Sequence, residues 1–170
     1  MKRRFWAVTA LALVLSVFSS TVSFAQGWGK AENKWFYYLE DGTVAKDTWI
    51  EEEGGSYWLR SDGVMATSQW VNDGTGWYYV DSSGRKLTSQ IMKLNDEIYW
   101  LGEDGKMAAD EWVCTENGKW YYFQSNGYAM RNGWKVVGGE YYYFLKSGIM
   151  AADALVPGGY RVGADGRWIQ

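Results

Sequence analysis

One motif recurs along almost the whole chain: a run of aromatic residues followed within a few positions by a glycine. One glycine per unit marks the repeat, and successive markers are 21, 21, 21, 22, 21 and 18 residues apart. The marker glycines are Gly42, Gly63, Gly84, Gly105, Gly127, Gly148 and Gly166. A fixed period of this length is typical of repeat architectures, in which each unit is stabilised by its neighbours and not by one large core.

Each unit contains two short strand-like runs joined by turn residues. From Trp112 onward, the run WVCT is followed by the turn ENG, the run KWYYF and a second turn, QSNG. Two β-rich runs joined by a short loop that contains glycine predict a hairpin. An isolated hairpin is marginal in water, so the sequence predicts an all-β fold, a solenoid of stacked β-hairpins built from tandem repeats of about 21 residues.

The segment that precedes the repeats predicts export. Residues 1–25 combine basic residues at positions 2–4, an apolar stretch over 5–18 and small residues near Ala25, a pattern typical of a secretory signal. The apolar stretch is shorter than the roughly 20 residues that span a bilayer. We therefore expect cleavage after Ala25, no membrane span after cleavage, and a secreted array over 26–170 with about six repeats and a truncated C-terminal cap.

Charge and composition exclude several functions. The predicted signal carries three of the 17 basic residues and none of the 20 acidic ones, which leaves the remaining chain at a net charge of −6 and disfavours nucleic acid as a partner. The single cysteine, Cys114, cannot form an intramolecular disulfide, and its role stays open.

Catalysis and metal binding are not expected. The chain has no histidine, which excludes Ser-His-Asp and Cys-His triads and zinc sites that need histidine. The acidic run 51–53 falls in a predicted turn and is interpreted as a solvated surface, and the recurring Asp-Gly pairs are interpreted as turn formers, since no dense calcium-loop pattern occurs. We expect no enzyme activity, no cofactor and no metal.

Two columns of the second strand are expected to form the core, because alternate residues of a strand share a face. These columns lie six and four residues before each marker glycine, and every unit fills them with a large or apolar residue. The six-before column contains Phe36, Tyr57, Tyr78, Tyr99, Tyr121, Tyr142 and Tyr160. The four-before column contains Tyr38, Leu59, Val80, Leu101, Phe123, Phe144 and Val162.

The opposite face predicts a binding surface. Its seven-before column accepts Ser56 and Gly159, so packing alone does not require a large residue there. Odd-numbered units carry tryptophan both at the opening of the unit, about 14 residues before the marker, and seven before it, and even-numbered units carry methionine two residues after it. The paired tryptophans are Trp28 and Trp35, Trp70 and Trp77, and Trp112 and Trp120, and the methionines are Met65, Met107 and Met150.

Two tryptophans, an aromatic residue from the next hairpin and a methionine are expected to close a cage. Aromatic faces attract cations, and each contact with a quaternary ammonium contributes about 0.5–2 kcal/mol. Several millimolar sites on one rod would raise avidity for a polymer. The competing interpretation is that Trp, Tyr and Met fill gaps between hairpins, as methionine often does.

The repeat resembles the choline-binding, or cell-wall-binding, repeats of bacterial autolysins and surface proteins. The resemblance rests on a pattern in which Gly-Trp opens a unit and Trp-Tyr-Tyr-Phe precedes the marker, seen best at 76–79, 118–123 and 133–134, and it covers about residues 27–170. It implies a hairpin solenoid that binds choline of teichoic acid in aromatic cages between hairpins, at the bacterial cell surface.

Carried over by position, the resemblance implies three cages walled by the tryptophan pairs above. Their third walls would be Trp58, Trp100 and Tyr143, with Met65, Met107 and Met150 alongside. Ser56, Ile98, Ile91 and Leu155 depart from the pattern, so about three sites are expected and not six. Related repeats bind glucan or other carbohydrate, and two alternatives stay open: a glycan-binding array, and a structural spacer with no small ligand.

Overall fold

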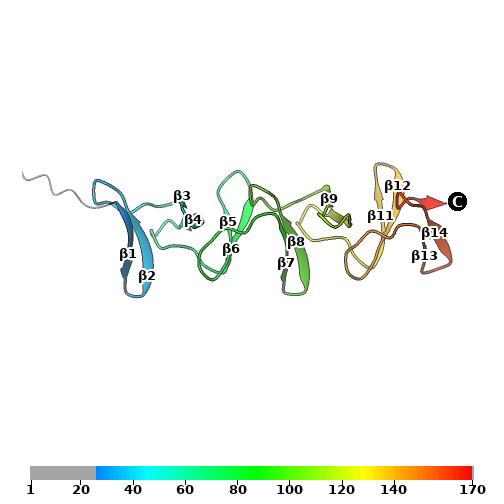
Figure 1. Cartoon of the computed structure of the whole chain (residues 1–170), viewed down its shortest axis with the longest axis horizontal. Helices are drawn as coiled ribbons and strands as arrows, with labels where there is room; N and C mark the ends of the chain where they lie inside the picture. The colour runs from blue at the N-terminus through cyan, green and yellow to red at the C-terminus, as the bar shows by residue number, and fades with distance from the viewer. Residues whose placement is uncertain (1–25, 170) are drawn as a thin grey trace, which may run out of the picture.

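The structure, a computed structural model, describes residues 26–169 as a rod of stacked β-hairpins (Figure 1). The predicted signal over 1–25 lies outside the described residues. Within residues 26–169 no helix is long and apolar enough to cross a membrane. The all-β hairpin solenoid predicted from the repeat is confirmed.

Seven antiparallel hairpins, numbered 1 to 7 in chain order, follow one another. They are β1 (Gly27–Ala31) with β2 (Lys34–Tyr38), β3 (Thr48–Glu52) with β4 (Gly55–Leu59), β5 (Gln69–Asn72) with β6 (Trp77–Val80), β7 (Gln90–Leu94) with β8 (Glu97–Leu101), β9 (Glu111–Cys114) with β10 (Trp120–Phe123), β11 (Gly133–Val137) with β12 (Glu140–Phe144), and β13 (Ala154–Val156) with β14 (Tyr160–Val162). A short strand, β15 (Trp168–Ile169), adds to hairpin 7.

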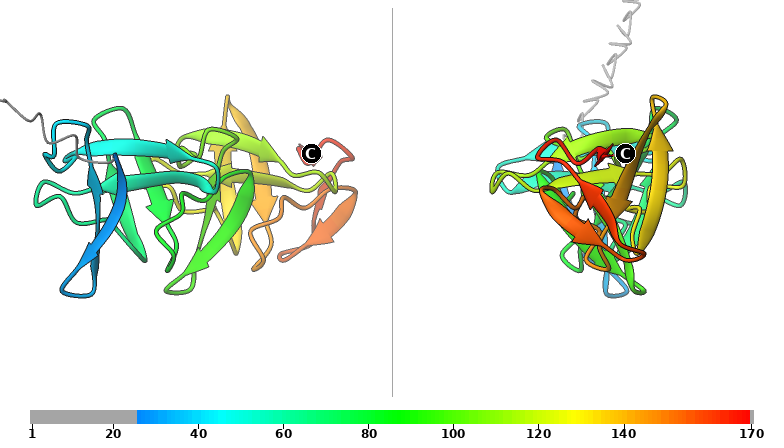
Figure 2. Two further views of the ribbon diagram at one scale, coloured as in Figure 1. Left: turned by 60° about the vertical axis from the view of Figure 1, so that its left-hand side comes forward. Right: turned by 90° about the vertical axis from the view of Figure 1, so that its right-hand side faces the viewer.

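Successive hairpins point in different directions around the rod. In Figure 1 the turns of hairpins 1 and 4 point downward and those of hairpins 3 and 6 point upward, and the end-on view in Figure 2 shows turns on several sides of the axis. The chain changes direction at a residue with positive φ (44° to 53°) immediately before the first strand of hairpins 2 to 7. These residues are Asp47, Ser68, Ser89, Asp110, Asn132 and Asp153. Asp and Asn are among the residues that adopt this conformation most readily.

A recurring backbone hydrogen bond connects consecutive hairpins from hairpin 1 to hairpin 6. We call the contact between hairpin n and hairpin n+1 joint n. The donor at joints 1 to 5 is the backbone N–H of the residue that stands two after the marker glycine. The acceptor is the carbonyl of the seven-before residue in the preceding unit, at 2.7–2.9 Å. The donor–acceptor pairs are Met65–Trp35, Lys86–Ser56, Met107–Trp77, Ala129–Ile98 and Met150–Trp120. This contact explains the double period, because each methionine lies beside an exposed tryptophan of the previous hairpin.

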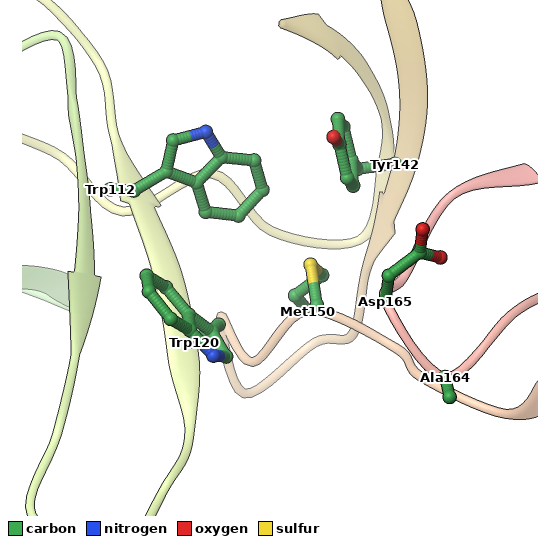
Figure 3. Close-up of a pocket in the computed structure, with 6 residues that line it drawn as sticks. All are labelled: Trp112, Trp120, Tyr142, Met150, Ala164 and Asp165. Carbon is green, nitrogen blue, oxygen red and sulfur yellow. The ribbon is translucent and has the colours of Figure 1, made fainter.

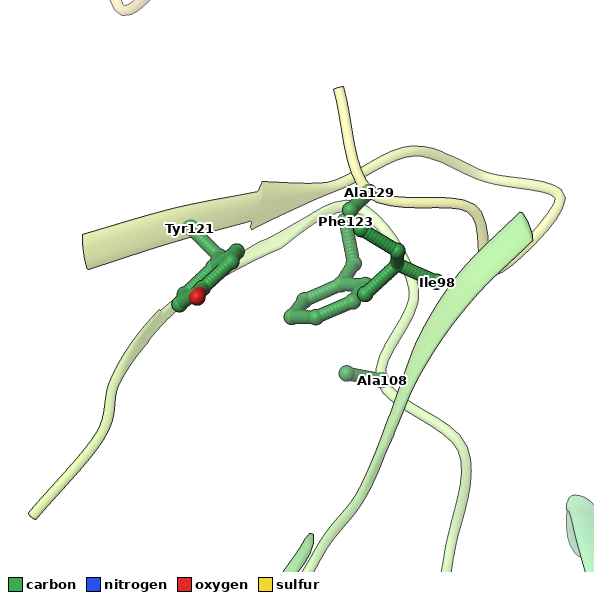
Figure 4. Packing of buried hydrophobic residues seen from close by; sticks show 5 residues of the cluster. All are labelled: Ile98, Ala108, Tyr121, Phe123 and Ala129. Atoms are coloured by element: carbon green, nitrogen blue, oxygen red, sulfur yellow. The ribbon is translucent and has the colours of Figure 1, made fainter. Parts of the chain in front are cut away.

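The four-before column forms the core, as predicted, except in hairpin 1, where Tyr38 is only half-buried. From hairpin 2 to hairpin 7 its side chains, Leu59, Val80, Leu101, Phe123, Phe144 and Val162, are fully buried. Figure 4 shows Phe123 enclosed by Ile98 and Ala108 of unit 4 and by Tyr121 and Ala129 of its own unit. The core is therefore a series of small clusters, each shared by neighbouring repeats.

The six-before column does not behave as a simple core column, which corrects the prediction. Tyr78, Tyr99 and Tyr121 are buried, but Tyr57 and Tyr142 are half-buried and Tyr160 is exposed. The reason is geometric: a hairpin in a stack has a neighbour on each face, so both faces of the hairpin contribute to joints. The tryptophan face of one hairpin meets the six-before tyrosine of the next.

Gly127 illustrates why the marker position requires glycine. Its φ is +81°, and a Cβ placed on it would overlap the Sδ and Cε atoms of Met107. Gly127→Ala should therefore lower the free energy of unfolding by about 2–3 kcal/mol, through left-handed backbone strain and displacement of Met107. Gly118→Ala is the matched control: φ is +73° and no atom lies within 4 Å of the added Cβ, so about 1 kcal/mol is expected. Urea denaturation of both variants measures the difference, and equal losses would contradict the packing role.

Candidate functional site

Joint 5 holds an open cavity of about 350 Å³ between hairpins 5 and 6 (Figure 3). Trp112 and Trp120 come from the two strands of hairpin 5, and Tyr142 and Met150 come from unit 6. The Trp112 ring lies 6.3 Å from that of Trp120 and 4.9 Å from that of Tyr142, at interplanar angles of 79° and 71°. Three steeply inclined rings and a thioether thus surround one volume, with Asp165 at its edge.

Packing behind the cavity holds the inner wall in place. Trp112 contacts Tyr122 across the hairpin at a ring distance of 5.3 Å and stacks on Phe144 of hairpin 6 at 5.6 Å. Trp120, by contrast, is 44% exposed. The cavity therefore has a rigid inner ring and an accessible outer ring, so most of its shape exists before any ligand enters.

Joint 1 repeats this arrangement with a cavity of about 410 Å³. Trp28 and Trp35 face Tyr57 and Met65, and the Trp28 and Tyr57 rings lie 5.3 Å apart at 75°. Trp35 is 42% exposed. The carboxylate-bearing residues at 52 and 53 also line the cavity, which adds negative charge beside the rings.

Joint 3 contains the same set of residue types in a more closed form. Trp70 lies 4.9 Å from Tyr99, and Trp77 is 46% exposed. Tyr128 packs edge-on against Tyr99 at 5.3 Å, and burial, together with the neighbouring Tyr128, raises the pKa of Tyr99 to about 12. Tyr99 is 7% exposed, whereas Tyr57 at joint 1 and Tyr142 at joint 5 are half-buried, so the tyrosine wall of joint 3 is more enclosed.

Joint 6 forms a further aromatic cavity of about 400 Å³ that sequence reasoning missed. Its walls are Trp134 and Tyr141 of hairpin 6 and Tyr160 and Trp168 of unit 7. Trp168 lies 5.8 Å from Tyr141 and 5.9 Å from Tyr160. The signal was present in the sequence: Trp168 stands two residues after Gly166, in the column that holds methionine at the predicted cages.

The structure corrects the expected third walls. Tyr57, Tyr99 and Tyr142, which were predicted to be core, occupy this place. The five-before residues Trp58, Trp100 and Tyr143 instead pair across their own hairpin with the residue that opens it. Tyr143 is 8% exposed beneath Trp134, and Trp58 packs at 5.2 Å against Trp49. Strand alternation assigns residues to a face of one hairpin, but the rotation between hairpins decides which residue of the next one faces it.

The chemistry of these cavities suits a soft cation. Aromatic faces carry negative electrostatic potential, and a methylated ammonium loses little hydration when it enters. Carboxylates border the cavities at joints 1 and 5. Among residues 26–169 no three Cys, Asp or Glu side chains are grouped as metal ligands would be.

A partly buried hydrogen bond to Asp73 predicts a pH effect at joint 2. The Trp49 indole Nε1 donates to Asp73 Oδ2 at 2.9 Å. Partial burial alone would raise the pKa of the Asp73 carboxyl, but the hydrogen bonds it accepts from Thr75, Trp49 and the Gly76 backbone lower its pKa to about 2.

A carboxyl group whose pKa is lower in the folded chain stabilises the fold above its unfolded pKa near 3.8 and loses that contribution as the pH falls toward 2. Between pH 5 and pH 2.5, wild type should therefore lose more stability than Asp73→Asn, measured as the denaturation midpoint at each pH. Parallel pH profiles for the two proteins would contradict this role of Asp73.

Comparison with known proteins identifies the repeat. The choline-binding repeat model matches residues 43–86 and 128–168, half of the chain, and the cell wall binding repeat model matches residues 110–129. Among curated proteins, none matches the chain.

Three solved structures are similar over most of the chain. CbpJ from Streptococcus pneumoniae TIGR4 is 33% identical with a TM-score of 0.70 and aligns over 85% of this chain and 48% of its own. Choline binding protein F from Streptococcus pneumoniae is 33% identical, with a TM-score of 0.68 over 86% of this chain and 48% of its own. The choline-binding domain of CbpL from Streptococcus pneumoniae is 29% identical, with a TM-score of 0.56 over 86% of this chain and 98% of its own.

The chain thus spans about half the length of the CbpJ and choline binding protein F chains. Further structures of choline binding protein F are of its complex with ipratropium and of the protein in the presence of a peptidoglycan analogue. With its repeat period, stacked hairpins and family-model matches, this chain belongs to the choline-binding repeat family.

Proposed function

We propose that the chain is a secreted, non-catalytic module that attaches to the bacterial cell wall by binding choline groups of teichoic acid or a similar wall polymer. The trimethylammonium groups enter the aromatic cavities at joints 1, 5 and 6, and joint 3 accepts them with less room. The observation that carries this proposal is the cavity of joint 5, in which three rings and Met150 surround a volume of about 350 Å³.

The angles between the rings favour a cation over a sugar. A sugar ring stacks on a flat aromatic platform and needs polar partners for its hydroxyl groups. At joints 1 and 5 the rings meet at 71–79°, so they form the sides of a cage and offer no shared plane. A cage of this shape places several π-faces around one compact positive group.

Several weak sites on one rod account for attachment to a surface. Each cage offers three rings, and contacts of about 0.5–2 kcal/mol per ring correspond to millimolar binding at one site. A polymer that carries many choline groups engages several cages at once, so the effective concentration at the second and third cage is high. Successive hairpins point to different sides of the rod (Figure 2).

A pair of isosteric ligands tests the proposal. Choline should change the tryptophan fluorescence of the folded array with a millimolar Kd, and 3,3-dimethylbutan-1-ol, which has the same shape without the charge, should bind at least tenfold more weakly because it lacks the cation–π attraction. Isothermal titration calorimetry provides a second measurement.

The possible results of this titration separate the alternatives. Equal affinity for choline and the neutral alcohol would contradict the cation cage. No response to choline at tens of millimolar, combined with retention on a glucan column, would favour the glycan-binding array. No response to either ligand would favour the structural spacer.

A further inference from the structure

Joint 2 has the ring pair of a cage but contains a cation of its own. Trp49 of hairpin 2 and Tyr78 of hairpin 3 lie 5.4 Å apart at 73°, nearly the same as Trp28 and Tyr57 at joint 1, which lie 5.3 Å apart at 75°. The Nζ atom of Lys86 lies 4.9 Å from the centroid of the Trp49 ring and 5.6 Å from that of Tyr78. One ammonium group therefore contacts both rings of this joint.

The backbone sets this placement. Lys86 stands two residues after its marker glycine and donates its N–H to the Ser56 carbonyl at 2.9 Å, as Met65, Met107 and Met150 do at their own joints. Its stem lies against Gly105 in the way that the stem of Met107 lies against Gly127. Lysine thus replaces the methionine of a cage without any change in the path of the chain.

Ser56 takes the place of the outer tryptophan that the open cages carry. Its position, seven before the marker, is held by Trp35 at joint 1 and by Trp120 at joint 5. Ser56 is 9% exposed, and its hydroxyl donates to Glu51. The missing indole leaves space for a long side chain, and the ammonium group reaches the two remaining rings.

The other cation–π contacts of residues 26–169 are of a different kind. Lys30 lies over the single ring of Trp35, and Lys135 lies over the single ring of Tyr122. Joint 4 differs in another way: Ile98 and Ala129 replace the outer tryptophan and the methionine and are buried. The cavity of about 330 Å³ at this joint, lined in part by Ile91, Trp100 and Tyr121, therefore lacks two walls of a cage.

We infer that Lys86 acts as a built-in substitute for the ligand, so that its ammonium group keeps joint 2 closed to choline-like cations. A ligand at millimolar concentration competes poorly with a group that is tethered at the site, since the tether gives that group a high effective concentration. Lys86 therefore decides which joints of the array take ligand. This inference rests on the proposed function, and it names the residue that limits the number of joints that bind ligand.

Lys86→Met tests the inference, because methionine is the residue that the open cages carry at this position. The probe is choline chloride, and the readout is the ¹⁵N-indole NMR signal of each tryptophan in the full chain. In wild type, choline should shift the signals of Trp28 and Trp112 and leave that of Trp49 unchanged. In Lys86→Met, the Trp49 signal should shift saturably as well, with an affinity about tenfold weaker than at joint 1, because one ring is missing.

Three further variants sharpen the experiment. Ser56→Trp combined with Lys86→Met should bring the affinity at joint 2 to within about threefold of joint 1, since it restores the third ring. Lys86→Arg keeps a cation at the position, so choline should leave the NMR signal of Trp49 unchanged. Lys46→Met removes the same charge from an exposed position. Choline should leave the NMR signal of Trp49 unchanged in this variant too.

The outcomes distinguish this inference from the proposed function. Two outcomes would overturn the role of Lys86 alone. One is a saturable shift of the Trp49 signal in wild type. The other is a Trp49 signal that choline leaves unchanged in both Lys86→Met and the double variant, while the signals of Trp28 and Trp112 shift. If choline shifted the signals of Trp28 and Trp112 in none of these proteins, the proposed function and the inference would be overturned together.

Discussion

Phe123→Ala should lower the free energy of unfolding by about 3–5 kcal/mol, the range typical of deleting a buried aromatic side chain. The Phe123 side chain is fully buried among residues of units 4 and 5, so its loss leaves a cavity where two repeats meet. Each repeat contacts mainly its neighbours, so the loss should be concentrated in hairpins 4 to 6. Urea denaturation gives the total effect, and hydrogen exchange locates it.

Trp120→Ala is the matched control for this prediction, because Trp120 lies in the same strand, β10, and is 44% exposed. Its loss should change the free energy of unfolding by less than about 1 kcal/mol, as most substitutions at exposed positions do. Similar losses of stability in Phe123→Ala and Trp120→Ala would contradict the division between core and cage residues.

Replacing the outer aromatic wall at joints 1, 3, 5 and 6 should abolish retention on a quaternary-amine resin. The variant combines Trp35→Ala, Trp77→Ala, Trp120→Ala and Tyr141→Ala, whose side chains are 42–48% exposed. Each change removes one cation–π wall, and affinity at each joint should fall about tenfold. Because attachment to a polymer combines several sites, the overall loss should exceed about a hundredfold.

The matched control changes the same column at joints 2 and 4, which lack the outer tryptophan. Ser56→Ala and Ile98→Val alter buried residues seven before their marker glycines, and retention should stay within about twofold of wild type. Both variants need an unchanged circular dichroism spectrum for the comparison. Retention of the quadruple variant at the wild-type level would show that the outer rings take no part in binding.

Much of the fold could be predicted from the sequence because it depends on features within a single hairpin. The marker glycines and the four-before column depend on the turns and the alternation of one hairpin, and the structure places both as expected. The paired tryptophans Trp28 and Trp35 could also be grouped, since strand alternation puts Trp35 on the side of the hairpin that carries Trp28.

The composition of each cage could not be predicted from one hairpin. The tyrosine that closes joint 1, Tyr57, comes from the next hairpin and from its opposite face, so its role depends on the rotation between units. That rotation is set at residues with positive φ such as Asp47, which the repeat alignment did not single out. Joint 6 was missed because Trp168 follows a shorter final spacing and replaces the expected methionine.

A crystal structure of the chain soaked with choline tests the central claim most directly. Trimethylammonium density should lie between Trp112, Trp120 and Tyr142 at joint 5 and in the corresponding cavities at joints 1 and 6, within cation–π distance of the rings. Cavities that stay empty at saturating choline, or ligand density found only away from the joints, would contradict it.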